Sequence, residues 1–413
     1  MPFDAVVIGA GHAGLAVSRR LADAGIEHVV LERGEIGESW RTQRWDSFRL
    51  NTPNAITRLP GGPEHARPEA FLGRDAWIAH LEAYARTGSL PVRDHANVTA
   101  VSADGNGGFD VMIGSDETVH TRSVVVASGI ANTQKLPPAA AEIDRGIEVL
   151  TTGTYRRPSQ LPPGAVLVVG SAQSGCQIAE DLLDAGRDVY LATGKAGRAP
   201  RRLRGRDTLA WLAESGWMAQ RREDLSDPAA IRAAQPQISG VGPIGHTVSL
   251  QWLARRGVTL LGHFESAEGT RVRFGDDLAQ HVRAGDEGSA KIRQHVDDYI
   301  ARSGLDAPAS DPDPADEPAD AESFRAPSEL DLADRGVRAV VFSTGFGTDY
   351  SWLRLPIVGT DGSVAHREGR TAVDGVWFVG LLWMRMRRSA IIAGAMDDSA
   401  YVAALVAARR GSA

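Results

Sequence analysis

Three glycines in the segment Gly9-Ala10-Gly11-His12-Ala13-Gly14 stand between a short apolar run, Ala5 to Ile8, and a segment with helical spacing. A second apolar run follows and ends in Glu32. Glycines in this pattern allow a tight turn and let a pyrophosphate approach the helix N-terminus closely. A carboxylate at the end of the second strand can accept hydrogen bonds from ribose hydroxyls. Together these features predict a β-α-β unit that binds a dinucleotide.

The same pattern returns in mid-chain. The turn Gly170-Ser171-Ala172-Gln173-Ser174-Gly175 follows the apolar run Val166–Val169 and opens another helical segment. Alanine replaces the middle glycine, so the ligand must stand slightly farther from the backbone. The two turns are too far apart to belong to one β-α-β unit. We therefore expect a second dinucleotide site.

The residues after the second unit bear on which dinucleotide it binds. No acid stands at the end of its second strand, and four cations follow: Lys195, Arg198, Arg201 and Arg202. A 2′-phosphate needs cations at this place, and a carboxylate would repel it. The pattern favours NADPH over NADH. The alternative is that these are solvated loop cations.

Two further strands end in small-residue turns, at Ser128-Gly129 and at Ser343-Thr344-Gly345. Such turns are typical of places where the chain crosses between two nucleotide domains. The sequence thus predicts an α/β fold with two dinucleotide-binding, Rossmann-like domains. The first is discontinuous, over residues 1–160 and 336–413, and the second is inserted at 161–335.

Other segments give coarser expectations. Asp75 is expected to cap a helix that runs to about Ala85, and three short strands near 98–101, 109–113 and 119–126 suggest a β-meander. Helices are expected over Ala290 to Arg302 and from about Ala390 to Ala408. The stretch 306–320 is rich in Asp, Pro and Ala, which predicts a solvated loop.

Composition excludes several classes of protein. Cys176 is the only cysteine among 413 residues, so a redox-active disulfide within the chain is excluded. The net charge of −7 argues against a nucleic-acid partner. The N-terminus lacks a basic leader, and no apolar run reaches membrane-spanning length, so we expect a cytoplasmic protein without a membrane partner. The scattered histidines show no metal-ligand spacing.

The order of these motifs resembles the flavin-containing monooxygenase group, the class B flavoprotein monooxygenases. Trp40-Arg41, the run Phe48-Arg49-Leu50-Asn51-Thr52-Pro53 and Gly380-Leu381-Leu382-Trp383 all fall where that group has counterparts. Three stretches look most like a bacterial subfamily whose genes lie near nitrilase genes: Cys176-Gln177-Ile178-Ala179-Glu180, Arg204-Gly205-Arg206-Asp207 and Arg387-Arg388-Ser389-Ala390.

The resemblance implies FAD at the first turn and NADPH at the second. It also implies monooxygenation of a small nitrogen- or sulfur-containing substrate by O2 through a C4a-(hydro)peroxyflavin. Asn51 resembles an asparagine that hydrogen-bonds near the flavin, although it could instead cap the turn before Pro53. Arg387 could stabilise reduced flavin, or could be a surface residue.

The resemblance extends to the residues that would hold the cofactors. The expected set is Gly9, Gly11, Gly14, Glu32, Trp40, Ser128, Gly129, Gly170, Ser171, Gln173, Ser174, Gly175, Lys195, Arg198, Gly345, Gly380, Arg388 and Ser389.

Two departures from the group narrow the expected chemistry. The group's Phe-x-Gly-x-x-x-His fingerprint is absent, and Thr151 stands where its histidine is expected. This argues against a Baeyer-Villiger reaction. Gln173 replaces a common asparagine, a change that keeps the amide. A flavin oxidase or dehydrogenase acting on a C–N bond stays open, as do a non-catalytic nucleotide-binding flavoprotein and a homodimeric assembly.

Overall fold

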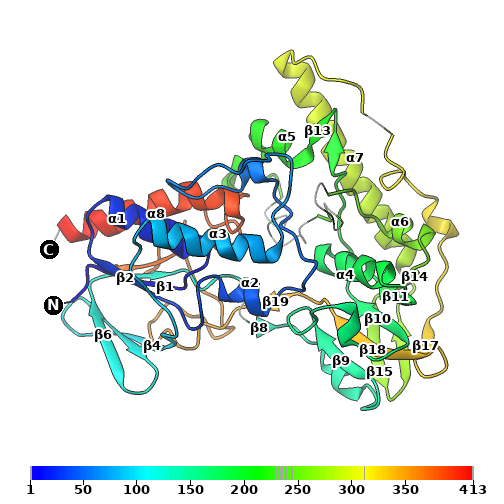
Figure 1. Cartoon of the computed structure of the whole chain (residues 1–413), viewed down its shortest axis with the longest axis horizontal. Coiled ribbons are helices and arrows are strands. Elements are labelled where there is room, and N and C mark those ends of the chain that lie inside the picture. The colour runs from blue at the N-terminus through cyan, green and yellow to red at the C-terminus, as the bar shows by residue number, and fades with distance from the viewer. Residues whose placement is uncertain are drawn as a thin grey trace.

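The computed structural model describes residues 2–411 apart from 132, 228–230, 232–235, 238–239, 241, 243–244 and 311. Two units lie side by side, each built on a five-stranded parallel sheet (Figure 1). Within the described residues, no helix combines the length and the apolar character that crossing a membrane requires.

The first sheet has the order β20-β7-β1-β2-β3. Its strands are β1 (Ala5–Ile8), β2 (His28–Leu31), β3 (Val92–Arg93), β7 (Val124–Val126) and β20 (Val376–Phe378). Helix α1 (His12–Asp23) connects β1 to β2, and the C-terminal helix α8 (Ala395–Gly411) packs along α1. Every residue of β1 is buried, as expected for a central strand covered on both faces.

The second sheet has the order β14-β11-β10-β18-β9. Its strands are β9 (Glu148–Thr151), β10 (Ala165–Val169), β11 (Val189–Ala192), β14 (Thr259–Leu261) and β18 (Val337–Phe342). Helix α4 (Gln173–Asp184) connects β10 to β11 as α1 connects β1 to β2. The expected pair of Rossmann-like units is confirmed.

Sheet membership differs from the domain limits expected from the sequence. The edge strand β9 lies before residue 161, and β18 lies after residue 335, yet both pair in the second sheet. Each is parallel to its neighbour; β18 buries Val337, Val340 and Phe342 in the core of the second unit, and β9 buries Leu150. The expected domain limits therefore assign β9 and β18 to the first domain, although both strands belong to the second sheet.

Two short strands join the units. The strands β8 (Thr133–Gln134) and β19 (Phe346–Gly347) pair antiparallel, with Phe346 opposite Gln134. They follow β7 and β18, and the backbone amide of Lys135 donates to the carbonyl of Gly345 at 3.0 Å. The two crossing turns expected from the sequence thus form one ribbon.

The expected β-meander is present as β4 (Val98–Ala103), β5 (Phe109–Ile113) and β6 (Glu117–Thr121). The third predicted segment divides, since its end continues as β7 of the first sheet. Helix α3 (Arg74–Thr87) is capped by Gly73, so the expectation that Asp75 caps it is wrong. The side chain of Asp75 accepts from Arg74 instead.

The predicted helices of the second half begin at other residues. Helix α7 (Leu278–Ser303) begins earlier than Ala290, and α8 begins five residues after Ala390. The remaining helices and strands are α2 (Glu38–Thr42), α5 (Thr208–Glu214), α6 (Leu250–Arg255), β12 (Arg202–Leu203), β13 (Arg206–Asp207), β15 (Phe264–Glu268), β16 (Arg271–Phe274) and β17 (Glu329–Asp331).

The loop 306–320 is not simply solvated. Asp316 is 3% exposed, and its carboxylate forms an ion pair with Arg198 and accepts from Ser289 Oγ at 2.7 Å. The side chain of Arg293 also donates to it. A buried carboxylate needs such partners, and they fix the loop against α7.

Replacing Asp316 with alanine should lower the free energy of unfolding by about 3 kcal/mol or more, because it leaves Arg198 buried with an incomplete set of partners. Urea unfolding would measure the change. The neighbouring exposed Glu317→Ala is the control and should stay within about 0.5 kcal/mol. Equal effects would show that the Asp316 ion pairs do not hold this loop.

Candidate functional site: two glycine turns and their junction

The first glycine turn is fixed by close backbone packing. Gly9 has φ +109°, and a Cβ placed there would lie 2.6 Å from the carbonyl oxygen of Ala127. A Cβ on Gly14 would lie 1.9 Å from the carbonyl oxygen of Gly9. Neither position can carry a side chain without moving β1, β7 or α1. These two glycines build the turn.

Gly11 is different, because a Cβ placed there meets nothing within 4 Å. It is the N-cap residue of α1 and makes no side-chain cap, so no side chain occupies the N-terminal amides from that position. Free amides at the positive end of a helix dipole attract an anion. The open space at Gly11 and these amides together form a cradle that fits a diphosphate.

Glu32 lies beside this cradle, 7% exposed, at the end of β2. Its Oε2 accepts from the amide of Ala10 at 2.7 Å, and its Oε1 accepts from the amide of Gly34 at 3.2 Å. Burial raises the pKa of the carboxyl, and the two amide hydrogen bonds oppose that rise. The structure thus places Glu32 next to the glycine turn, and its role as a ribose ligand stays a prediction.

The second turn repeats this geometry. Gly170 has φ +102°, and its Cβ would lie 2.6 Å from the carbonyl oxygen of Ser343; a Cβ on Gly175 would lie 1.7 Å from the carbonyl oxygen of Gly170. Ala172 is the N-cap residue of α4, where Gly11 stands in the first unit, and it also makes no side-chain cap. The hydroxyl of Ser171 accepts from the amide of Gly194 at 2.9 Å, which ties this turn to the end of β11.

The remaining turn residues lie around these cradles. Gly129 and Gly345 have φ +79° and +87°, with open space where a Cβ would be. Ser128 Oγ is buried and has no hydrogen-bond partner within the described part of the chain. Gly380, with φ +80°, follows β20 and faces Ala13 of α1, where a Cβ would lie 3.1 Å from the alanine Cβ.

Asn51 lies at the junction of the two units. Its Oδ1 accepts from Gln177 Nε2 at 3.3 Å, and its backbone carbonyl accepts from Arg201 Nη1 at 3.0 Å. Gln177 stands one helical turn after Gln173 in α4, so Asn51 faces the helix of the second glycine turn. Asn51 therefore does more than cap the turn before Pro53.

Arg198 is not placed to bind a 2′-phosphate. It is 2% exposed, and it forms ion pairs with Asp286 at 2.6 Å and Asp316 at 2.8 Å. Arg201 is also buried and forms an ion pair with Asp207. Lys195 is exposed after β11, and no ion pair of it is found among the described residues. Arg202 is exposed and forms an ion pair with Glu69 at 3.0 Å, so Lys195 is the one expected cation without an ion pair among the described residues.

Arg387, in the C-terminal segment, contacts residues 217–220 of the second unit. Its guanidinium lies 3.9 Å from the ring centre of Trp217 and 4.5 Å from that of Trp383, and Nη2 donates to Gln220 Oε1 at 2.6 Å. Burial lowers its pKa. Its role toward a flavin stays a prediction, because these partners already engage the guanidinium.

The neighbours of Arg387 stabilise the approach to α8. Arg388 forms an ion pair with Asp397 at 2.7 Å. The hydroxyl of Ser389, which is fully buried, accepts from the amides of Arg385 and Met386 at 3.3 Å. Both residues therefore have structural contacts beside any contact with a cofactor.

A group of rings around Arg44 was not anticipated from the sequence. The guanidinium lies 5.3 Å from the ring centre of Trp40, and 5.6 Å from those of Phe48 and Phe346. Burial lowers its pKa to about 10. Because Phe346 comes from the crossing ribbon, this cluster belongs to the junction. Trp40, Arg44 and Phe48 are spaced four residues apart in the sequence, but Phe346 is far along the chain, so the sequence alone does not show that the cluster lies at the junction.

Cys176 lies buried in α4, and its thiol donates to the carbonyl of Ser171 at 3.2 Å. Burial raises the pKa of this thiol, which makes it a poor nucleophile. No group of three or more metal-ligating side chains is found among the described residues.

Two open glycine turns at the carboxyl ends of two parallel sheets define a protein with two dinucleotide-binding units. The chain belongs to the pyridine nucleotide-disulphide oxidoreductase family, whose model matches residues 6–234. It is therefore an oxidoreductase, as predicted. Because Cys176 is its only cysteine, it cannot form the internal disulfide that the family name mentions.

Comparison with known proteins agrees with this assignment. The oxidoreductase CzcO-like of Geobacillus kaustophilus is 28% identical, over 97% of both chains. A flavin-containing monooxygenase from Stenotrophomonas maltophilia has a TM-score of 0.67 at 20% identity, over 99% of both chains. OTEMO, solved in complex with FAD and NADP, has a TM-score of 0.57 at 15% identity, over 99% of this chain and 86% of that one. The predicted fold of the flavin-containing monooxygenase group is confirmed.

The two kinds of glycine should respond differently to a methyl group. Gly14→Ala should lower the free energy of unfolding by about 2 kcal/mol or more, because its Cβ meets the Gly9 carbonyl. Gly11→Ala should stay within about 0.5 kcal/mol, since its Cβ points into open space. Denaturant unfolding of the two variants measures both. Equal losses of unfolding free energy in the two variants would contradict the view that Gly14 is required for packing of the turn and that Gly11 leaves space for a ligand.

Proposed function

We propose that this protein is an FAD-dependent, NADPH-consuming monooxygenase that uses O2 to oxygenate a small nitrogen- or sulfur-containing substrate. The observation that carries the proposal is the pair of open glycine turns, one on each sheet, joined through Asn51 and Gln177. The likeness to a flavin-containing monooxygenase and to a complex with FAD and NADP supports the choice of cofactors.

In the first unit, the α1 amides would hold the diphosphate of FAD, and Gly11 would allow its close approach. Glu32 would accept the ribose hydroxyls, since its carboxylate is already held beside the turn by two amides. The hydroxyl of Ser128, buried and without a partner among the described residues, would supply a further polar contact. Trp40 and Gly380 would line the same site.

In the second unit, the α4 amides would hold the NADPH diphosphate, with Ser171, Gln173 and Ser174 around the turn. Lys195 would pair with the 2′-phosphate. The residue after β11 is Thr193, whose hydroxyl lies 2.9 Å from His281 Nδ1, so no carboxylate stands directly there to repel a phosphate. The preference for NADPH thus rests on Lys195 and no longer on Arg198.

When bound, FAD would supply the redox chemistry that passes two electrons from NADPH to O2, with one oxygen atom entering the substrate and the other leaving as water. The chain's own part is to hold both dinucleotides and to keep bulk water out. Asn51 and Gln177 would set the approach of the two units, and the rings around Arg44 would exclude water at the junction.

The proposal is tested with purified protein reconstituted with FAD. We expect amines or sulfides to stimulate NADPH oxidation and to gain one labelled atom from ¹⁸O2. Gly11→Ala should fold yet bind FAD on the order of tenfold more weakly, because its Cβ fills the cradle. Flavin reduction by a substrate without NADPH would indicate an oxidase instead, and a flavin that no reductant reduces would indicate a non-catalytic protein.

Lys195→Glu should lower kcat/KM for NADPH about tenfold or more and leave that for NADH nearly unchanged, since only NADPH carries the 2′-phosphate. Steady-state kinetics with both coenzymes would measure this. Lys291→Glu, at an exposed lysine of α7, is the matched control. An equal loss with both coenzymes would assign Lys195 a role other than 2′-phosphate binding.

A further inference from the structure

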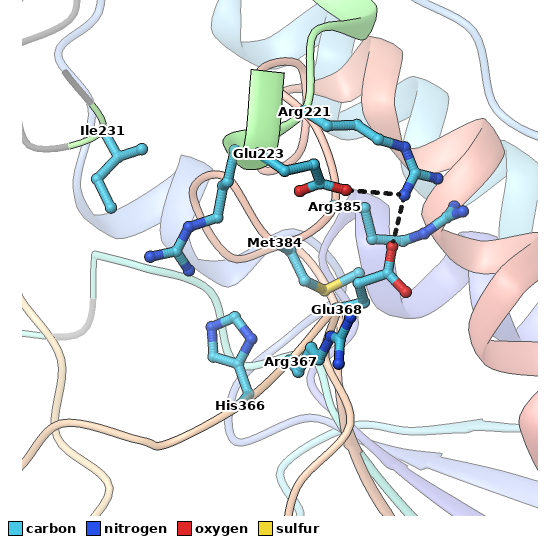
Figure 2. Close-up of a pocket in the computed structure, with 9 residues that line it drawn as sticks. Arg221, Glu223, Ile231, His366, Arg367, Glu368, Met384 and Arg385 are labelled. Atoms are coloured by element: carbon cyan, nitrogen blue, oxygen red, sulfur yellow. Dashed lines mark hydrogen bonds and ion pairs between the residues drawn. The ribbon is translucent and has the colours of Figure 1, made fainter. Parts of the chain in front are cut away.

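A cavity of about 510 Å³ lies where the insert meets the C-terminal part of the chain (Figure 2). Its walls come from residues 221–223 and Ile231 of the second unit, from 366–368 and from 384–385. None of the described residues that line it belongs to either glycine turn. It lies next to the contact between Arg387 and Gln220, which joins the same two segments.

Positive charge predominates in this cavity. Four arginines line it, at 221, 222, 367 and 385, against two glutamates, Glu223 and Glu368. The whole protein carries a net charge of −7, so this surplus runs against the overall charge. A concave site lined by one sign of charge concentrates ions of the opposite sign.

Both glutamates are already paired. Arg221 Nη1 lies 3.4 Å from Glu223 Oε1 and 3.0 Å from Glu368 Oε1, as Figure 2 shows. Arg385 is likewise engaged, because its guanidinium lies 4.3 Å from the ring centre of Tyr401 and 3.9 Å from Asp398 Oδ1. The charges of these paired groups therefore compensate one another. The positive charge that remains in the cavity comes from the other two arginines.

Arg222 and Arg367 are those two. Both are exposed at the cavity, and no described residue forms an ion pair with either of them. A guanidinium offers a planar fork of N–H donors that matches carboxylate or phosphate oxygens. The cavity therefore holds two arginines that have no ion-pair partner among the described residues, and their guanidinium groups can bind an oxyanion.

His366 adds a neutral donor. The backbone amide of Gly369 donates to its Nδ1 at 3.3 Å, so the proton of the neutral ring lies on Nε2. Burial and the nearby charge of Arg222 lower its pKa, which favours the neutral form at pH 7. Met384 lines the same cavity and supplies an apolar side chain (Figure 2).

We propose that this cavity binds a small organic anion, whose carboxylate or phosphate group lies between Arg222 and Arg367 and whose carbon skeleton contacts Met384. His366 Nε2 donates the third hydrogen bond. No described residue that lines the cavity belongs to either glycine turn, and the proposal goes beyond the proposed monooxygenase activity.

Calorimetric titration of the FAD-loaded protein with inorganic phosphate and with succinate, at constant ionic strength, tests the proposal. We expect saturable binding of at least one anion. The double variant Arg222→Gln/Arg367→Gln should bind it at least about tenfold more weakly, since two charge-assisted contacts are lost. Tighter binding of phosphate would assign a phosphate ester, and tighter binding of succinate a carboxylate.

Two controls make the result decisive. Arg145→Gln removes an exposed arginine on the turn before β9, outside the cavity, and should leave the affinity unchanged. The double variant should keep the wild-type unfolding temperature without anion but lose the stabilisation that the anion gives. No saturable binding of either anion, or equal affinity in wild type and double variant, would overturn the proposal.

Discussion

The carbonyl oxygen of the first glycine in each turn lies where the last glycine would place a Cβ. At Gly14 and Gly175 this distance would be 1.9 and 1.7 Å, well inside any allowed contact. The absence of two side chains therefore lets each helix begin directly at the end of its strand. That placement directs the helix amides at the carboxyl edge of the sheet, where a dinucleotide binds in folds of this kind. The other residues of the candidate site are arranged around these two glycine turns.

The junction between the units is polar and specific. Asn51 joins the first unit to the second through Gln177 of α4 and Arg201 of the loop after β11, while the ribbon of β8 and β19 carries the chain across. A buried arginine such as Arg201 is costly unless its partners are complete. Its ion pair with Asp207 lies within the second unit, and its hydrogen bond to the carbonyl of Asn51 adds a contact with the first. A defined junction is what an enzyme needs if two dinucleotides are to meet in one orientation.

Specific polar and aromatic contacts also join residues 217–220 of the second unit to the C-terminal part of the chain. Arg387 lies between two indole rings and binds Gln220, which fixes residues 217–220 beside the segment before α8. Residues close to this contact in the sequence, Arg221 and Arg385, line the arginine-lined cavity. Residues that the sequence suggested for flavin chemistry thus have a structural part in joining segments that are far apart in the chain.

The sequence by itself determined the two β-α-β units, their glycine turns and the position of Glu32. These depend on short-range geometry: apolar runs, glycine conformations and an acid one strand away. The sequence could not show that Arg198 is buried in ion pairs, or which residue Asn51 contacts. Arg198 pairs with Asp316 across 118 residues, and Asn51 bonds Gln177 across 126. Only the tertiary structure decides such contacts, because burial and pairing of a charge depend on which distant segment covers it.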